Sequence, residues 1–389
     1  MNATKFIKMI SELHTERFNV HITELANKKT PCGIFFGFEV IPRNAIDKVQ
    51  WLRNSGINLS CVIVLADVQA NALRKFVDVP VITLEDFPLF GEKNFPIKPQ
   101  EIFIKTFQDF PFAQYFINHG IEVLTHADDE RFLLIMKHLP ELYEVYKILA
   151  SDESKKVFCA AIKGRLTAKI SDYRFAPETQ YFLEGFTPSA GDIAIDAGAY
   201  DSGTAIAFAK CGAKVFAFEM DATNYKNCVT RLERFGKGYD ITLENLGLSD
   251  KEGEEKYFSW NTGSRKDSNG TFTAKFIDLD TYVAKKNLSR VDYIKLDIEG
   301  AEWEMLKGAA KTITRCKPKM AVSAYHRPED LWTLATYIKS LRPDYEFEFR
   351  HYQIDYNDYK LNDEERALLR YFGLNCFSPT SCEMVLYCR

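Results

Sequence analysis

Charged residues interrupt an otherwise apolar stretch in the C-terminal half of the chain, DYIKLDIEGAEWEML. Its apolar residues predict one strand and the start of the helix after it. Lys295 and Asp297 are two residues apart, so on a strand their side chains share one face, and Glu299 and Glu302 follow directly. Charges on a covered strand are costly unless they are paired. The stretch therefore predicts a reactive site built on carboxylates and one ammonium group.

Three roles are open for Asp297. It is a general base or orienting group for an acceptor hydroxyl, a metal ligand with Glu299 and Glu302, or a structural acid that pairs with Lys295 and caps the helix beginning near Gly300. Mg²⁺ or Ca²⁺ accepts closely spaced carboxylates. Nothing else in the sequence completes a cage, so no metal site is predicted.

Two further residues are candidates for the base. His326 lies in SAYHRPED, at the end of a predicted strand, and histidine titrates near neutral pH. A structural role is also open for it. Lys295 serves as a base only if burial lowers its pKa, and its position on the strand favours pairing with Asp297 or Asp196.

A second set of residues predicts a ligand at two neighbouring strand ends. In IDAGAYDSGTA, Asp196 ends a strand, and Gly198 and Gly203 allow the backbone to approach a ligand. Glu219 ends the next strand, 23 residues after Asp196. In nucleotide-binding sheets an acid about 20 residues further on takes the ribose hydroxyls. On the following strand end, Asn245 either recognises an adenine edge or makes a turn.

These residues need a sheet to bring them together. From residue 186 onward the chain predicts a mostly parallel sheet with an antiparallel edge. Its expected strands are 191–199, 213–219, 240–247, 291–297, 317–326, 345–352 and 383–389. Its expected helices are 202–210, 222–235, 300–315 and 328–341.

The N-terminal half predicts a separate organisation. Residues 1–100 indicate a small α/β domain, with strands at 33–40, 59–66 and 79–84 and helices at 45–56 and 69–76. Residues 101–185 are predicted to form a mainly helical connector, and residues 186–389 the second domain. A length of 389 residues agrees with two domains.

Composition excludes several classes of partner. The net charge is −4, with 50 basic and 54 acidic residues, which makes nucleic acid a poor candidate substrate. No run approaches the roughly 18 apolar residues of a membrane span. The N-terminal residues 1–18 lack an apolar signal region, and the nine cysteines form no C-x-x-C pair, so we expect a cytoplasmic protein with reduced thiols. The sequence gives no indication of oligomeric state.

Several motifs occur together in one order: DAGAYDSG, FAFEMDATNYKN, ENLGLSD, IDLDTYV, IKLDIEGAE, SAYHRPEDLW and EMVLYCR. This series resembles the FkbM-type family of class I S-adenosylmethionine-dependent methyltransferases, over roughly residues 180–389. The resemblance implies an α/β fold, with a Rossmann-like seven-stranded methyltransferase sheet in the order 3-2-1-4-5-7-6. A smaller degenerate α/β nucleotide-fold domain and the helical connector precede it.

The resemblance also implies S-adenosylmethionine as cofactor, bound over the first three strand ends. The glycine loop, Glu219 with Met220 at the ribose, the residues beside the adenine and Asp297 near the methyl group form the expected cofactor site. Its members are Asp196, Gly198, Ala199, Tyr200, Gly203, Glu219, Met220, Asn245, Gly247 and Asp297.

We therefore expect an O-methyltransferase acting on a hydroxyl of a sugar, glycan or similar polar small molecule, with Asp297, His326 and Lys295 as catalytic candidates. One alternative is a nicotinamide-dependent oxidoreductase, but G-x-G-x-x-G is missing at both candidate turns. The other is a non-catalytic scaffold. The joint presence of Asp196, Gly198, Glu219 and Asp297 argues against it.

Overall fold

The structure is a computed structural model. It describes residues 2, 4–6, 8, 26–27, 29–37, 42–93, 95–104, 111–125, 129–259, 263–355, 363–374, 377–380 and 382–389. Most of the N-terminal segment 1–18 and residues 38–41, which include the end of the first predicted strand, lie outside these ranges.

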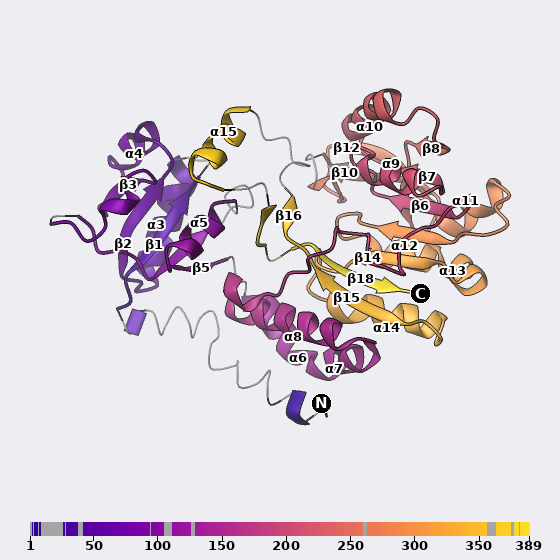
Figure 1. Cartoon of the computed structure of the whole chain (residues 1–389), viewed down its shortest axis with the longest axis horizontal. Helices are drawn as coiled ribbons and strands as arrows, with labels where there is room; N and C mark the ends of the chain where they lie inside the picture. Colours follow the sequence, from indigo (N-terminus) through magenta and orange to yellow (C-terminus); the bar gives the residue numbers. More distant parts are fainter. Residues whose placement is uncertain are drawn as a thin grey trace. The chain divides into compact units, whose positions relative to one another are not determined.

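The chain divides into two compact units (Figure 1). Unit 1 comprises residues 1–140, 156–176 and 351–381, and unit 2 comprises 141–155, 177–350 and 382–389. Both units are therefore assembled from stretches that are distant in the sequence. The division into three continuous segments, 1–100, 101–185 and 186–389, stays a prediction.

Unit 1 is built on a parallel sheet whose described strands run in the order β3-β2-β1-β4-β5. Its first part alternates strands and helices: β1 Cys32–Phe36, α3 Pro42–Asn54, β2 Leu59–Val64, α4 Asp67–Leu73 and β3 Val81–Thr83. β1 and β2 are almost continuously apolar and buried, as expected for parallel strands that are covered on both faces.

The remaining strands of this sheet come from the segment that was predicted to be mainly helical. They are β4 Glu101–Ile104 and β5 Glu122–Leu124. Runs of three or four apolar residues are too short for the sequence period to distinguish strand from helix. The same segment does contain helices: α5 Ala113–Asn118, α6 Asp129–Lys137, α7 Leu139–Ile148 and α8 Asp152–Thr167. Residues 141–155, which include most of α7 and the start of α8, belong to unit 2. Unit 1 contains the hairpin β16 Ile354–Asp355 and β17 Phe377–Ser378, and α15 Asp363–Tyr371.

Unit 2 contains the second predicted sheet. Its described strands are β6 Ile193–Ala197, β7 Lys214–Phe218, β8 Ile241–Glu244, β13 Tyr293–Leu296, β14 Lys319–Ser323, β15 Phe347–His351 and β18 Met384–Cys388. They run in the order β8-β7-β6-β13-β14-β18-β15, which is the predicted order 3-2-1-4-5-7-6. β18 pairs antiparallel with β14, so the predicted antiparallel edge is confirmed.

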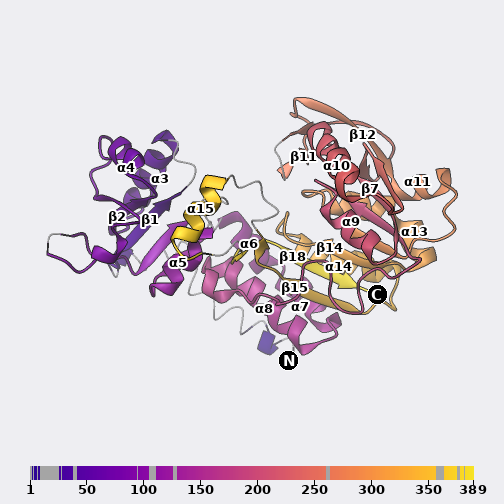
Figure 2. The same ribbon diagram turned by 45° about the horizontal axis from the view of Figure 1, so that its top comes forward.

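Two groups of helices cover this sheet. α9 Gly203–Lys210 packs on β6, β7 and β8 and contacts α10 Ala222–Phe235. The second group consists of α11 Leu279–Lys285, α12 Glu302–Gly308, α13 Ala310–Cys316 and α14 Asp330–Leu341. Figures 1 and 2 both draw α9 and α10 near β7, and α14 near β14 and β15. The strand order reverses between β6 and β13, which creates a topological switch point where open α/β sheets bind ligands.

A second, smaller sheet in unit 2 was absent from the sequence prediction. Its described strands run in the order β11-β10-β12-β9: β9 Gly247–Ser249, β10 Gly253–Phe258, β11 Arg265–Lys266 and β12 Phe272–Asp278. β10 reads GEEKYF and buries little beyond Tyr257. A mostly polar, exposed strand carries no apolar alternation by which a sequence could reveal it.

No helix in the ranges that the structure describes has the length and apolar character needed to cross a membrane.

Candidate active site

Lys295 lies on β13 directly beside Asp196 on β6, at the switch point. Its Nζ is 3.2 Å from Asp196 Oδ1, and both side chains are buried. Nζ also donates hydrogen bonds to the carbonyl oxygens of Gly198, at 2.6 Å, and Ala197, at 3.3 Å. Burial by itself lowers the pKa of Lys295, but the charges of Asp196 and Asp297 outweigh it and raise this pKa. These contacts favour an ion pair with Asp196 as the role of Lys295 over a role as general base.

The glycine loop after β6 is held by backbone contacts. Gly198 has a φ of +82°, and a Cβ there would lie 1.8 Å from the carbonyl oxygen of Asp297. The N–H groups of Gly198 and Ala199 both donate to the Phe218 carbonyl at the end of β7, at 3.1 and 2.9 Å. Three strand ends therefore meet at a position that only glycine fits.

Glu219 follows β7 and is 6% exposed. Its two carboxylate oxygens accept one backbone N–H each, from Tyr200 and Asp221, both at 2.8 Å. Burial raises the pKa of Glu219 to about 7, although these two hydrogen bonds act in the opposite direction. A buried carboxylate thus lies beside the glycine loop, at the position where a ribose-binding acid was predicted.

Asn245 and Gly247 have structural contacts at the next strand end. Asn245 Nδ2 donates to the Glu219 carbonyl at 2.8 Å, which agrees with the turn role that was left open for this residue. Gly247 pairs with Phe276 on β12, and a Cβ on Gly247 would lie 2.3 Å from the Phe276 ring. Met220 packs against the cluster that contains Tyr257 and Phe276. Contacts of these residues with an adenine stay a prediction.

Gly203 begins α9, and its N–H donates to Asp201 Oδ1 at 2.9 Å. Asp201 also forms an ion pair with Arg231 on α10. Tyr200, which completes the loop, has a φ of +52°, and its carbonyl accepts a hydrogen bond from Cys228 Sγ. The loop is thus tied to both helices that cover it.

Asp297 follows β13 and faces a tyrosine from an earlier part of the chain. Tyr181 Oη donates to Asp297 Oδ2 at 2.8 Å. Burial by itself raises the pKa of Asp297, but the charges of Lys295 and His326 and the Tyr181 hydrogen bond together lower it. Asp297 is therefore held as a carboxylate.

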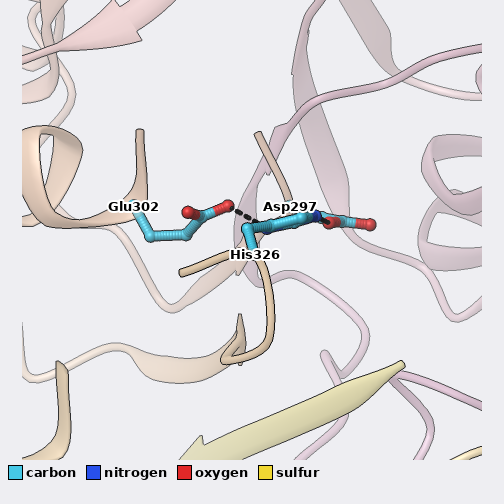
Figure 3. Close-up of side chains that lie close together, drawn as sticks. All are labelled: Asp297, Glu302 and His326. Carbon is cyan, nitrogen blue, oxygen red and sulfur yellow. Dashed lines mark hydrogen bonds and ion pairs between the residues drawn. The ribbon is translucent and has the colours of Figure 1, made fainter. Parts of the chain in front are cut away.

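His326 lies between carboxylates on both sides of its ring, as Figure 3 shows. Nδ1 is 2.9 Å from Glu302 Oε1, while Nε2 is 3.4 Å from Asp297 Oδ1 and 3.6 Å from Glu299 Oε2. Burial lowers the pKa of His326, but the charges of Glu302 and Glu299 prevail and raise it well above its ordinary value. A histidine that retains its proton in this way is a weak candidate for the base.

The site contains residues that the sequence analysis did not identify. Tyr181 and Gln180 come from the predicted connector, far from Asp297 in sequence. Gln180 Nε2 donates to Glu383 Oε2 at 2.7 Å, and Glu383 immediately precedes β18. Burial, together with the charge of Asp297, raises the pKa of Glu383 to about 7. One signal was available for Glu383: the first residues of an antiparallel strand lie at the carboxyl edge of its parallel neighbours.

The structure brings Asp196, Lys295, Asp297 and His326 together at the switch point. Glu219 joins them through the glycine loop. This arrangement can hold a polar ligand over the ends of β6 and β7 and orient a second molecule beside Asp297.

Comparisons with known proteins agree with this arrangement. Residues 196–373 match the family model described as the methyltransferase FkbM domain. Among solved structures, the chain is similar to methyltransferase FkbM from Methylobacillus flagellatus KT, with a TM-score of 0.65 and 20% identity over 99% of this chain and 98% of that chain. At this identity the likeness shows the fold alone.

Two further similarities are weaker. An rRNA methylase from Streptococcus thermophilus has a TM-score of 0.32 and 14% identity, over 55% of this chain and 97% of that chain. Precorrin 8w decarboxylase from Methanobacterium thermoautotrophicum has a TM-score of 0.31 and 15% identity, over 52% of this chain and 82% of that chain. Neither similarity supports a conclusion about this chain. No curated protein matches the chain.

The family match spans the strand ends that carry Asp196, Glu219, Lys295, Asp297 and His326. It lies on a sheet whose strand order is the one predicted from the motif series. Residues 196–373 therefore belong to the FkbM family of methyltransferases.

Proposed function

We propose that the chain is an S-adenosylmethionine-dependent O-methyltransferase that acts on a hydroxyl of a sugar, glycan or similar polar metabolite. The observation that carries this proposal is the position of Asp297. Its carboxylate lies at the switch point of an FkbM methyltransferase sheet, beside a glycine loop that Glu219 joins to the next strand end. Family membership also favours methyl transfer over nicotinamide-dependent oxidation.

The residues present fit the cofactor. Glu219 is a buried carboxylate with one backbone donor on each oxygen, and the remaining lone pairs can accept the two hydrogens of a ribose diol. Gly198 takes a left-handed conformation where strand ends converge, which brings the loop backbone to the carboxyl edge of the sheet. When bound, S-adenosylmethionine supplies a methyl group on a positively charged sulfur.

Asp297 orients the acceptor. Methyl transfer to a hydroxyl is an in-line displacement, so alignment of the acceptor oxygen supplies much of the catalysis. Asp297 would accept the hydroxyl hydrogen bond and take the proton as the methyl C–S bond breaks and the new C–O bond forms. The oxygen becomes strongly acidic at that moment, so a carboxylate with a lowered pKa is basic enough.

Lys295 and His326 are positioning residues in this proposal. Lys295 holds the glycine loop through the Gly198 carbonyl, and the charge of the His326 ring lies on the far side of Asp297. The acceptor side also contains Glu299, Glu383 and Gln180, whose oxygen and amide groups suit a molecule with several hydroxyls. This polar surrounding supports the sugar-like substrate class that the resemblance implies.

Calorimetry with S-adenosylmethionine tests the proposal. We expect saturable binding by the unmodified chain and loss of binding in Glu219→Ala, because the ribose loses its carboxylate. Glu233→Ala, at an exposed position of α10, is the matched control and should bind normally. Full affinity in Glu219→Ala, with the control unchanged, would refute the assignment of the ribose site.

The same preparations test the role of Asp297. Asp297→Asn should retain cofactor binding and lose at least about a hundredfold in the rate of methyl transfer to a panel of polyhydroxylated acceptors. An Asn variant with unaltered turnover would show that Asp297 does not orient the acceptor.

A further inference from the structure

Three buried polar atoms lie in one cluster on the acceptor side of the site. Asp297 Oδ1, His326 Nε2 and Glu302 Oε2 have no hydrogen-bond partner among the residues that the structure describes. Asp297, Glu302 and His326 also offer ligand atoms that all lie within 4.8 Å of one another. His326 is only 8% exposed, so water does not readily satisfy its ring nitrogen. Buried polar atoms normally have partners, so Asp297 Oδ1 and His326 Nε2, which face each other, indicate a missing ligand.

The orientation of His326 identifies the atom that faces the ligand. Glu302 Oε1 accepts a hydrogen bond from Nδ1 at 2.9 Å and another from the Ile298 N–H at 2.9 Å. Nδ1 therefore carries the hydrogen, and Nε2 is directed to the opposite side of the ring, as Figure 3 shows. A carboxylate that fixes a histidine through one nitrogen, so that an ion can replace the proton on the other, is the usual arrangement behind a metal-binding histidine.

The distances from Nε2 suit a cation better than a hydrogen bond. Nε2 lies 3.4 Å from Asp297 Oδ1 and 3.6 Å from Glu299 Oε2. Charge-assisted N–H···O bonds measure about 2.7–2.9 Å, so both separations are too long. Two ligands bound to one tetrahedral cation at about 2.1 Å lie about 3.4 Å apart. Glu299 is 31% exposed, so its side chain has room to adjust.

We propose that Asp297, Glu299 and His326 Nε2 bind one divalent first-row transition ion, with Glu302 orienting the histidine. One imidazole nitrogen with carboxylate oxygens favours ions such as Mn²⁺ or Zn²⁺ over Mg²⁺. The sequence alone predicted no metal site, because nothing in it completed a cage around the carboxylates, and His326 is 24 residues from Glu302. Binding of the ion is independent of the proposed function. Its use in catalysis, where it would hold the acceptor oxygen and lower the pKa of the hydroxyl, rests on that function.

Titration of the whole chain with Mn²⁺ tests the site. Protein freed of metal with EDTA, without cofactor or acceptor, is titrated while electron paramagnetic resonance measures free Mn²⁺. We expect one bound ion per chain, and pulsed resonance should detect coupling to one imidazole nitrogen. His326→Gln should remove that coupling and weaken binding at least about tenfold, and Glu302→Gln should also weaken it about tenfold or more.

Glu299→Gln provides a variant that should fold, since its side chain is partly exposed, and it should weaken binding as well. Glu329→Gln is the matched control. Glu329 precedes α14 three residues after His326, its side chain caps no helix, and its variant should bind Mn²⁺ normally. Circular dichroism establishes that each variant is folded. Absence of bound Mn²⁺ at about 1 mM in the unmodified chain, or unaltered binding in folded His326→Gln, would overturn the proposal.

Failure of this proposal is distinguishable from failure of the proposed function. Calorimetry with S-adenosylmethionine is repeated in the presence of EDTA. A chain that binds the cofactor but no Mn²⁺ refutes the metal site alone. A chain that binds Mn²⁺ through His326 but no cofactor supports the metal site and refutes the methyltransferase assignment.

Discussion

At the scale of single residues, the site depends on how buried charges are stabilised. Lys295 is buried, and its ammonium group contacts the Asp196 carboxylate and two backbone carbonyls, so the ion pair and these carbonyls stabilise the buried charge. Removing one partner of such a pair is strongly destabilising, since the other charge stays in a medium of low polarity. Burial also raises the pKa of Glu219, because it outweighs the two backbone N–H donors of this carboxylate.

Glu219 should make stability depend on pH. Burial raises its pKa to about 7 in the folded chain, from an ordinary value of 4.5. The folded state thus holds the proton more tightly, so this contribution to stability is full below about pH 4.5 and is lost as pH rises through about 7. At 1.36 kcal/mol per pKa unit, the free energy of unfolding should fall by about 2–3 kcal/mol between about pH 5 and pH 8.

Urea unfolding of the unmodified chain and of Glu219→Gln at both pH values measures this effect. Glutamine does not titrate, so the difference in stability between the two proteins should change with pH by that amount. The substitution also weakens the hydrogen bonds that backbone N–H groups donate to this side chain. That loss of stability is the same at both pH values, so it cancels when the two differences are compared. A difference that is the same at both pH values would contradict the raised pKa.

At the scale of elements, the switch point depends on how closely the ends of β6 and β13 approach. The Asp297 N–H donates to the Ala197 carbonyl at 3.2 Å, and the Asp297 carbonyl occupies the space that a side chain at position 198 would need. The register of β6 and β13 also places Lys295 beside Asp196. Gly198, the register of β6 and β13 and the Lys295–Asp196 ion pair thus all belong to the same close approach of the two strand ends.

Gly198→Ala should therefore be strongly destabilising. Its φ of +82° disfavours alanine, and the added Cβ would lie 1.8 Å from the Asp297 carbonyl oxygen. Together these effects should lower the free energy of unfolding by about 3 kcal/mol or more. Urea unfolding followed by circular dichroism measures the loss.

Gly253→Ala is the matched control for that substitution. Gly253 begins β10, and no atom lies within 4 Å of the Cβ that alanine would add. We expect a change within about 0.5 kcal/mol at this position. Equal stabilities of the two alanine variants would show that the approach of β6 and β13 is looser than described.

At the scale of the whole molecule, unit 2 is completed by stretches that precede the family domain. Ser151 and Ser154 donate hydrogen bonds to the buried carboxylate of Glu348 on β15. Leu149 forms a bridge with Phe347 on the same strand. Tyr181 donates to Asp297 in the site itself. The methyltransferase sheet therefore depends on residues outside 186–389.

A fragment of residues 186–389 should consequently fold less well than one of residues 139–389. The shorter fragment lacks Ser151 and Ser154, so the Glu348 carboxylate loses the hydrogen bonds that they donate. It also lacks Tyr181, so Asp297 loses the hydrogen bond from the tyrosine hydroxyl. Each lost partner of a buried group costs about 1–3 kcal/mol, so we expect a difference of at least about 3 kcal/mol. Urea unfolding of both fragments measures it, and similar midpoints with similar slopes would contradict the dependence.

The sequence alone determined the large features of unit 2. The apolar runs and their spacing predicted its seven strands, and the motif series predicted their order and the family. The charged pattern around Asp297 predicted that carboxylates and one ammonium group gather there, and the contacts of Lys295 and Asp297 agree with that grouping, whereas the reactivity of the site stays a prediction. These predictions succeeded because each rests on neighbouring residues along the chain, and because parallel strands direct their carboxyl ends to one edge.

The tertiary structure decided which atoms meet. It placed His326 between Glu302 and Asp297, and it brought Tyr181 and Glu383 to the same carboxylate cluster. It also added the sheet that contains β10 and the strands β4 and β5. None of these could be read from local patterns, because contacts between residues distant along the chain depend on how whole elements pack, and short or exposed strands leave no apolar period.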